Sequence, residues 1–342
     1  MKRTLVIALL FLLGIAVFIL VRGSGEPNRD AADAGNVETI TLKGACQFDE
    51  SHVFTRTIRK FEELVKKYYD GPVEFDLYLN SELGLEKDYF AYMSQGISVD
   101  YGIVSPSHMS TFSSVAPIMD MPFLFRDVEH WNNVLKSDTF EPIGDEIAEK
   151  ADVKLIGYAG GGVRNLIAKR PVTNIDQLKG LSIRVMGAPI QTDIFQAIGA
   201  SPTVIAYSEI YNAMQTGVID AAENEAAGVQ QMKFYEVGPE ICLTQHAITV
   251  RPLCFSGKTF RRLPPKLQEA IIRAGREAGA YGRQLESKED ATILSRLEKE
   301  GKVRVHEFAA REELLRLAEP VKAAYAREID AEEVLKRVDA IK

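Results

Sequence analysis

Two arginines stand out because each lies within an otherwise apolar segment. Arg164 belongs to the run "VRNLIA", and Arg184 lies inside the short predicted strand "LSIRVMG". Removing a guanidinium group from water is costly unless an anion pairs with it. That anion could be an internal carboxylate, such as Glu223 or Glu225, or the carboxylate of a bound ligand. Spacing alone leaves both alternatives open.

Catalytic motifs are missing from the sequence, which contains no GxGxxG, GxxxxGK[ST], GxSxG or HExxH. The glycine-rich segment "YAGGGVRN" (158–165) is followed by a predicted strand, so no helix N-terminus is available there to hold a phosphate. The histidines are scattered singly, and only His52, at the start of the first predicted helix, is a candidate for chemistry. We therefore expect no enzyme activity, no cofactor and no metal, with an exported hydrolase or isomerase as an alternative.

Strands and helices alternate in the first part of the chain. Hydrophobic periodicity predicts strands at 37–45, 73–79 and 100–105, a helix that ends before the breaker Asp70-Gly71-Pro72, and a short helix in "EKDYFAYMSQG". This alternation predicts βαβ units and a mainly parallel sheet.

A second α/β region follows. Strands are predicted at 153–159 and 181–185, with the segment "VRNLIAK" between them, and helices at 189–197 and from Ser208 to about Gly217. From Pro264-Pro265, helical periodicity continues toward Leu297. A continuous helix of about 30 residues would span about 45 Å, so we expect it to brace both regions.

Length and charge narrow the class of protein. The chain has 342 residues and a net charge of −7, which predicts two domains and argues against nucleic-acid binding, because that function needs a basic surface. Cys46, Cys242 and Cys254 lack the spacing of a zinc site. A bridge between Cys242 and Cys254 is left open.

The N-terminus predicts export. Lys2 and Arg3 precede an apolar run from Leu5 to Val21, as in a signal peptide or an N-terminal anchor (residues 1–22), and residues 23–37 are polar and suit a linker. The rest of the chain is expected in the periplasm, either released or tethered to the inner membrane if the segment is not cleaved.

One long stretch carries a family resemblance. Residues 173–225 combine a D-x-L-K-G-x-x-I-R-V strand, a G-A-S-P-T connection, an S-E-x-Y-x-A-x-Q-T-G-x-x-D helix and a terminal E-N. This stretch resembles the DctP-like solute-binding subunits of tripartite ATP-independent periplasmic (TRAP) transporters. Further matches include "SELGLEKD" and "PFLFRD", so that the resemblance covers about residues 38–330.

The resemblance implies roles for three residues. Arg184 matches the family arginine that pairs with the ligand carboxylate, a task for which a guanidinium fork is geometrically suited. Arg164 matches a second carboxylate-facing arginine, and Asn224 matches a ligand-contacting asparagine. Four more candidates are less specific, since each could equally be a capping, packing or rim residue: Gln47, Glu86, Tyr207 and Gln245.

The resemblance does not fix the ligand. Glu86 in the pocket would favour a sugar acid or hydroxy acid over a C4-dicarboxylate, although Arg164 could neutralise a second carboxylate. Gly187 stands where some sialic-acid binders have asparagine, which argues against a sialic-acid ligand.

The implied fold is α/β and two-lobed, like that of periplasmic binding proteins, with crossing strands and a long bracing helix. Lobe I is predicted at 38–161 plus 250–289, and lobe II at 162–249 plus 290–342. The lobes would close on a small carboxylate ligand, which a monomer would deliver to a small and a large integral-membrane subunit. A membrane-tethered ligand sensor on the same fold is the alternative function.

Overall fold

The computed structural model describes residues 38–342. The predicted N-terminal segment (1–22) and linker (23–37) lie outside the described residues. Within the described part of the chain, no helix is both long and apolar enough to cross a bilayer.

All strands of residues 38–342 join one sheet in the order β2-β1-β3-β8-β4-β7-β5-β6, with β9 also paired to β8. Their bounds are β1 (Ile40–Ala45), β2 (Val73–Tyr78), β3 (Tyr101–Ile103), β4 (Val153–Ala168), β5 (Ser182–Val185), β6 (Ser201–Val204), β7 (Ala221–Asn224), β8 (Glu240–Ser256) and β9 (Arg304–Glu307).

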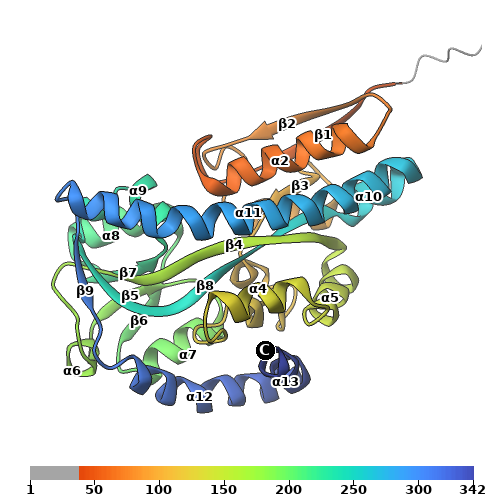
Figure 1. Ribbon diagram of the computed structural model, residues 1–342. Coiled ribbons are helices and arrows are strands. Elements are labelled where there is room, and N and C mark those ends of the chain that lie inside the picture. The colour runs from red at the N-terminus through yellow and green to blue at the C-terminus, as the bar shows by residue number, and fades with distance from the viewer. Residues whose placement is uncertain (1–37) are drawn as a thin grey trace, which may run out of the picture. The chain divides into compact units, whose positions relative to one another are not determined.

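The helices surround this sheet (Figure 1). The α-helices are α2 (Val53–Tyr68), α3 (Glu86–Gln95), α4 (Val128–Lys136), α5 (Glu141–Ala151), α6 (Ile175–Leu178), α7 (Pro189–Ala197), α8 (Ile210–Thr216), α9 (Ala226–Gln231), α10 (Gly257–Arg262), α11 (Pro265–Lys299), α12 (Arg311–Glu328) and α13 (Glu332–Ala340). The 3-10 helices are η1 (Pro106–Met109), η2 (Ala116–Asp120), η3 (Tyr207–Glu209) and η4 (Phe234–Glu236).

The sheet has two halves that share β4 and β8. In the first half, β3 pairs with the C-terminal part of β8, and β1 and β2 continue outward in parallel. In the second half, β7 pairs with the C-terminal part of β4, followed by β5 and β6. The sheet is mixed: β4 and β8 run antiparallel along their length, whereas the strands outside them pair in parallel within each half, as expected for βαβ units. The two crossing strands thereby join the halves.

β4 is longer than expected, since 153–159 and "VRNLIAK" form one strand of 16 residues. Its register with β8 shifts between Gly160 and Val163. Gly160 and Gly161 have φ values of 118° and 123°, which other residues rarely adopt. The Thr249 hydroxyl on β8 accepts hydrogen bonds from the N–H groups of Gly161 (2.9 Å) and Gly162 (3.0 Å). Those bonds keep the glycine segment attached to the sheet.

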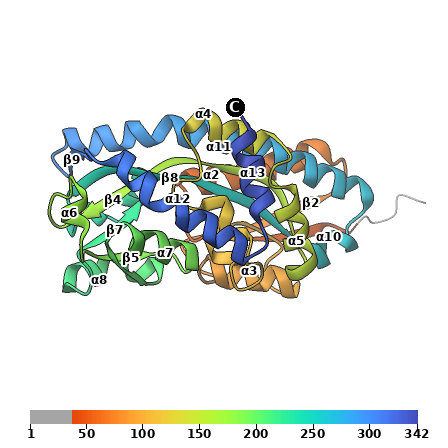
Figure 2. The same ribbon diagram turned by 90° about the horizontal axis from the view of Figure 1, so that it is seen from below.

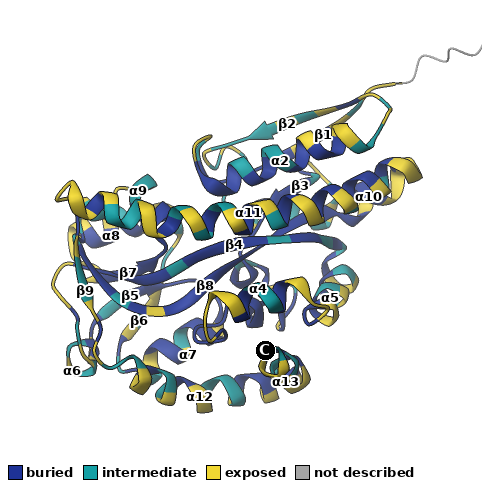
Figure 3. Ribbon diagram, viewed as in Figure 1, coloured by how far each residue is buried: buried dark blue, intermediate teal, exposed yellow. Residues whose placement is uncertain are grey.

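Helix α11 spans both halves, as predicted. Its 35 residues make it about 52 Å long, and it lies along β4 and packs against α2 and α9 (Figures 1 and 2). Small residues permit the close approach: a Cβ on Gly279 would lie 2.7 Å from the backbone of Tyr158. The central strands between the helices are largely buried (Figure 3).

The two C-terminal helices, α12 and α13, contact different parts of the molecule. Helix α12 packs against α7 in the second half. Beyond it, the α13 carbonyls of Val338 and Asp339 accept hydrogen bonds from His130 and Arg126, in a region that the predicted division assigns to the other lobe. The lobe boundaries stay a prediction.

The three cysteines are buried and free. Cys242 and Cys254 lie near opposite ends of β8, so the bridge left open by the sequence is absent from this structure.

Candidate functional site

The strand register brings five predicted or implicated polar residues together. Asn165 pairs with Asn224 across β4 and β7, and Ile183 pairs with Ala221 across β5 and β7. This places Arg164 and Arg184 beside the C-terminal end of β7, where α9 begins. We call the group the β7 cluster; all its members are buried, and they are Arg164, Arg184, Glu223, Asn224 and Glu225.

Arg164 is bonded to its neighbours through all three guanidinium nitrogens. Its Nε donates to Glu223 Oε2 (2.5 Å), its Nη1 to Glu225 Oε2 (2.6 Å) and Asn224 Oδ1 (3.1 Å), and its Nη2 to the Glu223 carbonyl (2.9 Å). Burial opposes the charged form, but the two glutamates outweigh it and raise the pKa of Arg164 above its usual range. Of the two alternatives for Arg164, the structure contains the internal salt bridge to Glu223 and Glu225. Its role as a second ligand-facing arginine stays a prediction.

Arg184 is bonded far less completely. Its Nε donates to the carbonyl of Ile205 (3.0 Å), and its Nη1 lies 3.6 Å from Glu223 Oε1, beyond hydrogen-bond distance. Its Nη groups form no hydrogen bond with residues 38–342, although its side chain is only 3% exposed. Burial is the main cause that lowers the pKa of Arg184 to about 10, so the group is still charged at neutral pH. Arg184 is therefore a buried cation whose Nη donors have no hydrogen-bond partner among residues 38–342.

Glu223 links the two arginines. Despite its burial, Arg164 and His246 hold the pKa of Glu223 below its usual range. His246 Nε2 lies 3.3 Å from Glu223 Oε2, and burial lowers the pKa of that histidine. The carboxylate thus stays ionised and is shared between Arg164 and Arg184.

Asn224 and Tyr207 meet beside this carboxylate. The Asn224 amide accepts from Arg164 and donates from Nδ2 to the Tyr207 hydroxyl at 3.4 Å. Tyr207 also packs edge-on against Phe48, with ring centroids 5.9 Å apart. Two predicted site residues are thereby in contact with each other, and Tyr207 also contacts Phe48, which follows β1 in the opposite half.

A second polar group lies on that opposite half, around the first turn of α3. The fully buried Glu86 accepts from Gln47 Nε2 (3.1 Å), from the Ser105 N–H (2.6 Å) and from His108 Nδ1 (3.0 Å), and lies 3.9 Å from Arg251 Nη1. Burial disfavours its charge, but Arg251 and His108 hold the pKa of Glu86 at about 2. We call the α3 cluster the group Gln47, His52, Glu86 and Arg251.

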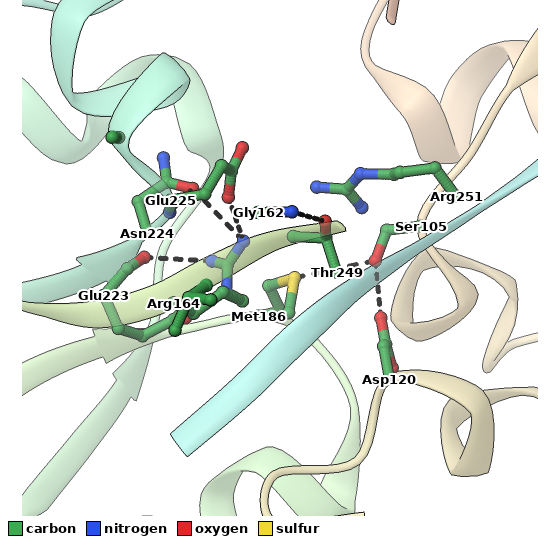
Figure 4. Close-up of polar contacts among 12 residues, drawn as sticks. Ser105, Asp120, Gly162, Arg164, Met186, Glu223, Asn224, Glu225, Thr249 and Arg251 are labelled. Carbon is green, nitrogen blue, oxygen red and sulfur yellow. Dashed lines mark hydrogen bonds and ion pairs between the residues drawn. The ribbon is translucent and has the colours of Figure 1, made fainter. Parts of the chain in front are cut away.

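Arg251 and His52 are the members that sequence reasoning did not assign to the site. Arg251 is a charged residue within the apolar strand segment "TVRPLCF", the same signal that identified Arg164 and Arg184. His52 caps α2 by accepting the Phe54 N–H at Nδ1 (3.2 Å). In Figure 4 the Arg251 guanidinium points toward the side on which Glu225 and Arg164 lie.

Direct contacts join the two halves around these clusters. Gln191 Nε2 at the start of α7 donates to the Asp120 carbonyl (3.1 Å), and the Ser110 hydroxyl donates to the Gly187 carbonyl (3.2 Å). Ser105 Oγ lies 2.6 Å from Asp120 Oδ2 and 3.6 Å from Met186 Sδ (Figure 4). The halves therefore meet over the buried polar groups.

Gln245 is placed differently from the other candidates. Its side chain is exposed, while its N–H donates to Asn165 Oδ1 (3.0 Å) and its carbonyl accepts from Arg311. Its contribution to the site stays a prediction, and its contacts do not join it to either cluster. Within residues 38–342, no group of three or more His, Cys, Asp or Glu side chains could hold a metal ion.

Comparison with known proteins identifies relatives along most of the chain. Residues 46–330 match the model of the DctP family, described as bacterial extracellular solute-binding protein, family 7. A solute-binding protein of Sulfitobacter sp. (strain NAS-14.1) is 56% identical over 94% of this chain and 97% of its own length. A solute-binding protein of Roseobacter denitrificans is 31% identical over 75% of this chain and 78% of its own.

Solved structures give the same result. A TRAP periplasmic solute-binding protein from Sulfitobacter sp. NAS-14.1, with bound α-D-taluronate, has a TM-score of 0.86 at 56% identity, covering 88% of this chain and 97% of that one. One from Citrobacter koseri, with bound D-glucuronate, has a TM-score of 0.82 at 28% identity, covering 88% and 99%.

These findings confirm the predicted α/β, two-lobed fold and the predicted family. The relatives and the solved structures named above are all described as solute-binding proteins, which gives the sensor alternative no support. The chain therefore belongs to the DctP family and is a solute-binding protein of the TRAP type.

Proposed function

We propose that this protein captures a sugar acid through one carboxylate, which pairs with Arg184. The observation that carries the proposal is the state of that arginine, a buried cation whose Nη groups have no hydrogen bond to residues 38–342. A guanidinium presents two parallel donors that match a carboxylate. The bound α-D-taluronate of the 56% identical neighbour supports a sugar acid as the ligand class.

Arg164 and Asn224 then act mainly on the geometry of the pocket. Arg164 forms ion pairs with Glu223 and Glu225. Because these carboxylates are already paired, the Arg184 guanidinium is left for the carboxylate of the ligand. Asn224, positioned by Arg164, can exchange its 3.4 Å contact with Tyr207 for a ligand hydroxyl. An amide can both donate and accept, which suits a hydroxyl group.

Closure of the two halves buries the ligand. A ligand drives closure only as far as it binds the closed state better than the open state. The contacts of Gln191 with Asp120 and of Ser110 with Gly187 are of the kind that stabilise a closed state. We further propose that the protein acts as a periplasmic monomer without catalytic activity and delivers its cargo to small and large membrane subunits.

A thermal-shift screen of the region from residue 38 tests the ligand class. The panel contains D-taluronate, D-glucuronate, L-galactonate, succinate and N-acetylneuraminate. A ligand at about 100 times its Kd adds about 2.7 kcal/mol to the free energy of unfolding. We expect stabilisation by one or more of D-taluronate, D-glucuronate and L-galactonate, and none by succinate or N-acetylneuraminate. A flat response to all three sugar acids, or a response to succinate alone, would refute the proposal.

A further inference from the structure

Three buried side-chain atoms of the α3 cluster have no hydrogen-bond partner among residues 38–342: His52 Nε2, Gln47 Oε1 and Arg251 Nε. The three residues are 5%, 8% and 6% exposed. A buried polar atom without a partner is destabilising, because it has lost its hydrogen bonds to water and gained none in the protein. Three such atoms in one group point to a ligand that supplies the partners.

The three side chains are linked through shared neighbours, Phe54 and Glu86. The ring centroids of His52 and Phe54 lie 4.8 Å apart, and the Arg251 guanidinium carbon lies 5.0 Å from the Phe54 ring centroid. Gln47 and Arg251 are joined through Glu86. The positive charges of Arg164 and Arg251, besides burial, lower the pKa of Arg184. In Figure 4 the Arg251 guanidinium lies on the side facing Glu225 and Arg164, so the α3 cluster faces the β7 cluster from the other half of the sheet.

The free atoms define a hydrogen-bonding pattern. Because His52 Nδ1 accepts a backbone N–H, the proton of the neutral ring is on Nε2, which is then a donor. Burial and Arg251 lower the pKa of His52 to about 3, which keeps the ring neutral. Arg251 Nε is a second donor. Gln47 uses its Nε2 on Glu86, so Oε1 remains as an acceptor.

The charge of the α3 cluster is balanced internally. Arg251 faces the ionised Glu86 at 3.9 Å, and His52 is neutral. The cluster consequently offers hydrogen bonds without a net positive charge. The cluster suits hydroxyl and ring oxygens. Because it has no net positive charge, it does not attract a second carboxylate.

We propose that His52 and Arg251, together with Gln47, form a second recognition subsite that binds the hydroxyl and ring oxygens at the end of the ligand remote from its carboxylate. The proposal deepens the proposed function and rests on it. It makes these residues the determinants that select a monocarboxylate with a polyhydroxyl tail over a dicarboxylic sugar acid or an unsubstituted carboxylate.

The test compares D-taluronate with cyclohexanecarboxylate, which keeps a six-membered ring and a carboxylate but has no hydroxyl group. The variants are His52→Asn, whose amide oxygen can still cap α2, and Arg251→Lys, which keeps the positive charge beside Glu86 but has no Nε donor. Affinities are measured by calorimetry, with displacement titration for the weaker probe, and melting temperatures report folding. A loss of about 3- to 10-fold for each variant is expected for D-taluronate, the effect of one hydrogen bond, while the affinity for cyclohexanecarboxylate stays within about 2-fold.

Equal losses for both probes in both variants would show general damage to the pocket, and no loss for D-taluronate would show that the two residues do not contact it; either result overturns the subsite. Glu86→Gln adds an independent measurement, because it leaves the positive charge of Arg251 unbalanced. We expect it to raise the affinity for D-glucarate relative to D-glucuronate, and an unchanged ratio contradicts the charge argument. Failure of the wild type to bind any sugar acid would instead refute the proposed function.

Discussion

The β7 cluster and the α3 cluster differ in how their buried charged and polar groups are hydrogen-bonded. In the β7 cluster, Arg164 is bonded through every guanidinium nitrogen to its own chain, and Arg184 is the member with spare donors. In the α3 cluster, unpartnered atoms are spread over three residues. We infer that the β7 cluster binds the charged group of the ligand through one strong contact. The α3 cluster makes several weaker contacts that depend on the ligand's shape and on the positions of its hydroxyl groups.

The largest expected effect separates the two arginines of the β7 cluster. Arg164→Ala leaves Glu223 and Glu225 buried without their main partner, so the free energy of unfolding should fall by about 3 to 5 kcal/mol. Denaturant titration measures this fall. Arg56→Ala is the matched control, because its ion pair with Glu289 is partly exposed and should contribute at most about 1 kcal/mol. Equal effects of the two substitutions would contradict the structural role of Arg164.

Arg184→Ala should have the opposite profile. We expect a loss of about 2 to 5 kcal/mol in affinity for D-taluronate, measured by calorimetry, with a smaller loss of stability than Arg164→Ala because Glu223 keeps Arg164 and His246. Arg184→Lys keeps the charge and loses the fork, so it should recover only part of the affinity. If Arg184→Ala bound D-taluronate as tightly as the wild type, Arg184 would not be the residue that pairs with the ligand carboxylate.

The α3 cluster predicts a pH effect on stability. The pKa of His52 is about 3 in the folded protein, against an ordinary value of 6.5. The unfolded chain therefore binds a proton below pH 6.5 that the folded chain does not, and stability falls as the pH falls below that value. Between pH 6.5 and pH 5 the decrease should be about 1.6 kcal/mol larger in the wild type than in His52→Asn. Parallel stability curves for the two proteins would show that His52 is not held neutral.

The smallest effect is expected at Gln245. Its exposed side chain belongs to neither cluster, so Gln245→Ala should change both the affinity for D-taluronate and the free energy of unfolding by less than about 0.5 kcal/mol. A larger loss of affinity in calorimetry would place Gln245 in the site after all.

The sequence identified residues better than it identified their partners. Arg164 and Arg184 were recognisable because each is a charge within an apolar strand. The choice between an internal and an external partner depends on the pairing of β4 with β7, which sets Glu223 beside Arg164. Those residues are 59 positions apart, and no local pattern encodes that contact. Arg251 carried the same signal and was missed.

The continuity of β4 was equally hidden. Three consecutive glycines normally indicate a break, but Gly160 still pairs with Val250 of β8, and the N–H groups of Gly161 and Gly162 donate to the Thr249 hydroxyl. By contrast, the long helix was predictable, because its periodicity is local and continues from Pro265 to Lys299.

A crystal structure with D-taluronate bound would test the central claim most directly. We expect the carboxylate oxygens at about 2.7 to 3.0 Å from the Arg184 guanidinium nitrogens. Arg164 should still be bonded to Glu223 and Glu225, and the hydroxyl groups should face His52, Gln47 and Arg251. A ligand bound in the reverse direction, with its carboxylate on Arg251 and its hydroxyl groups on Arg184, would contradict it.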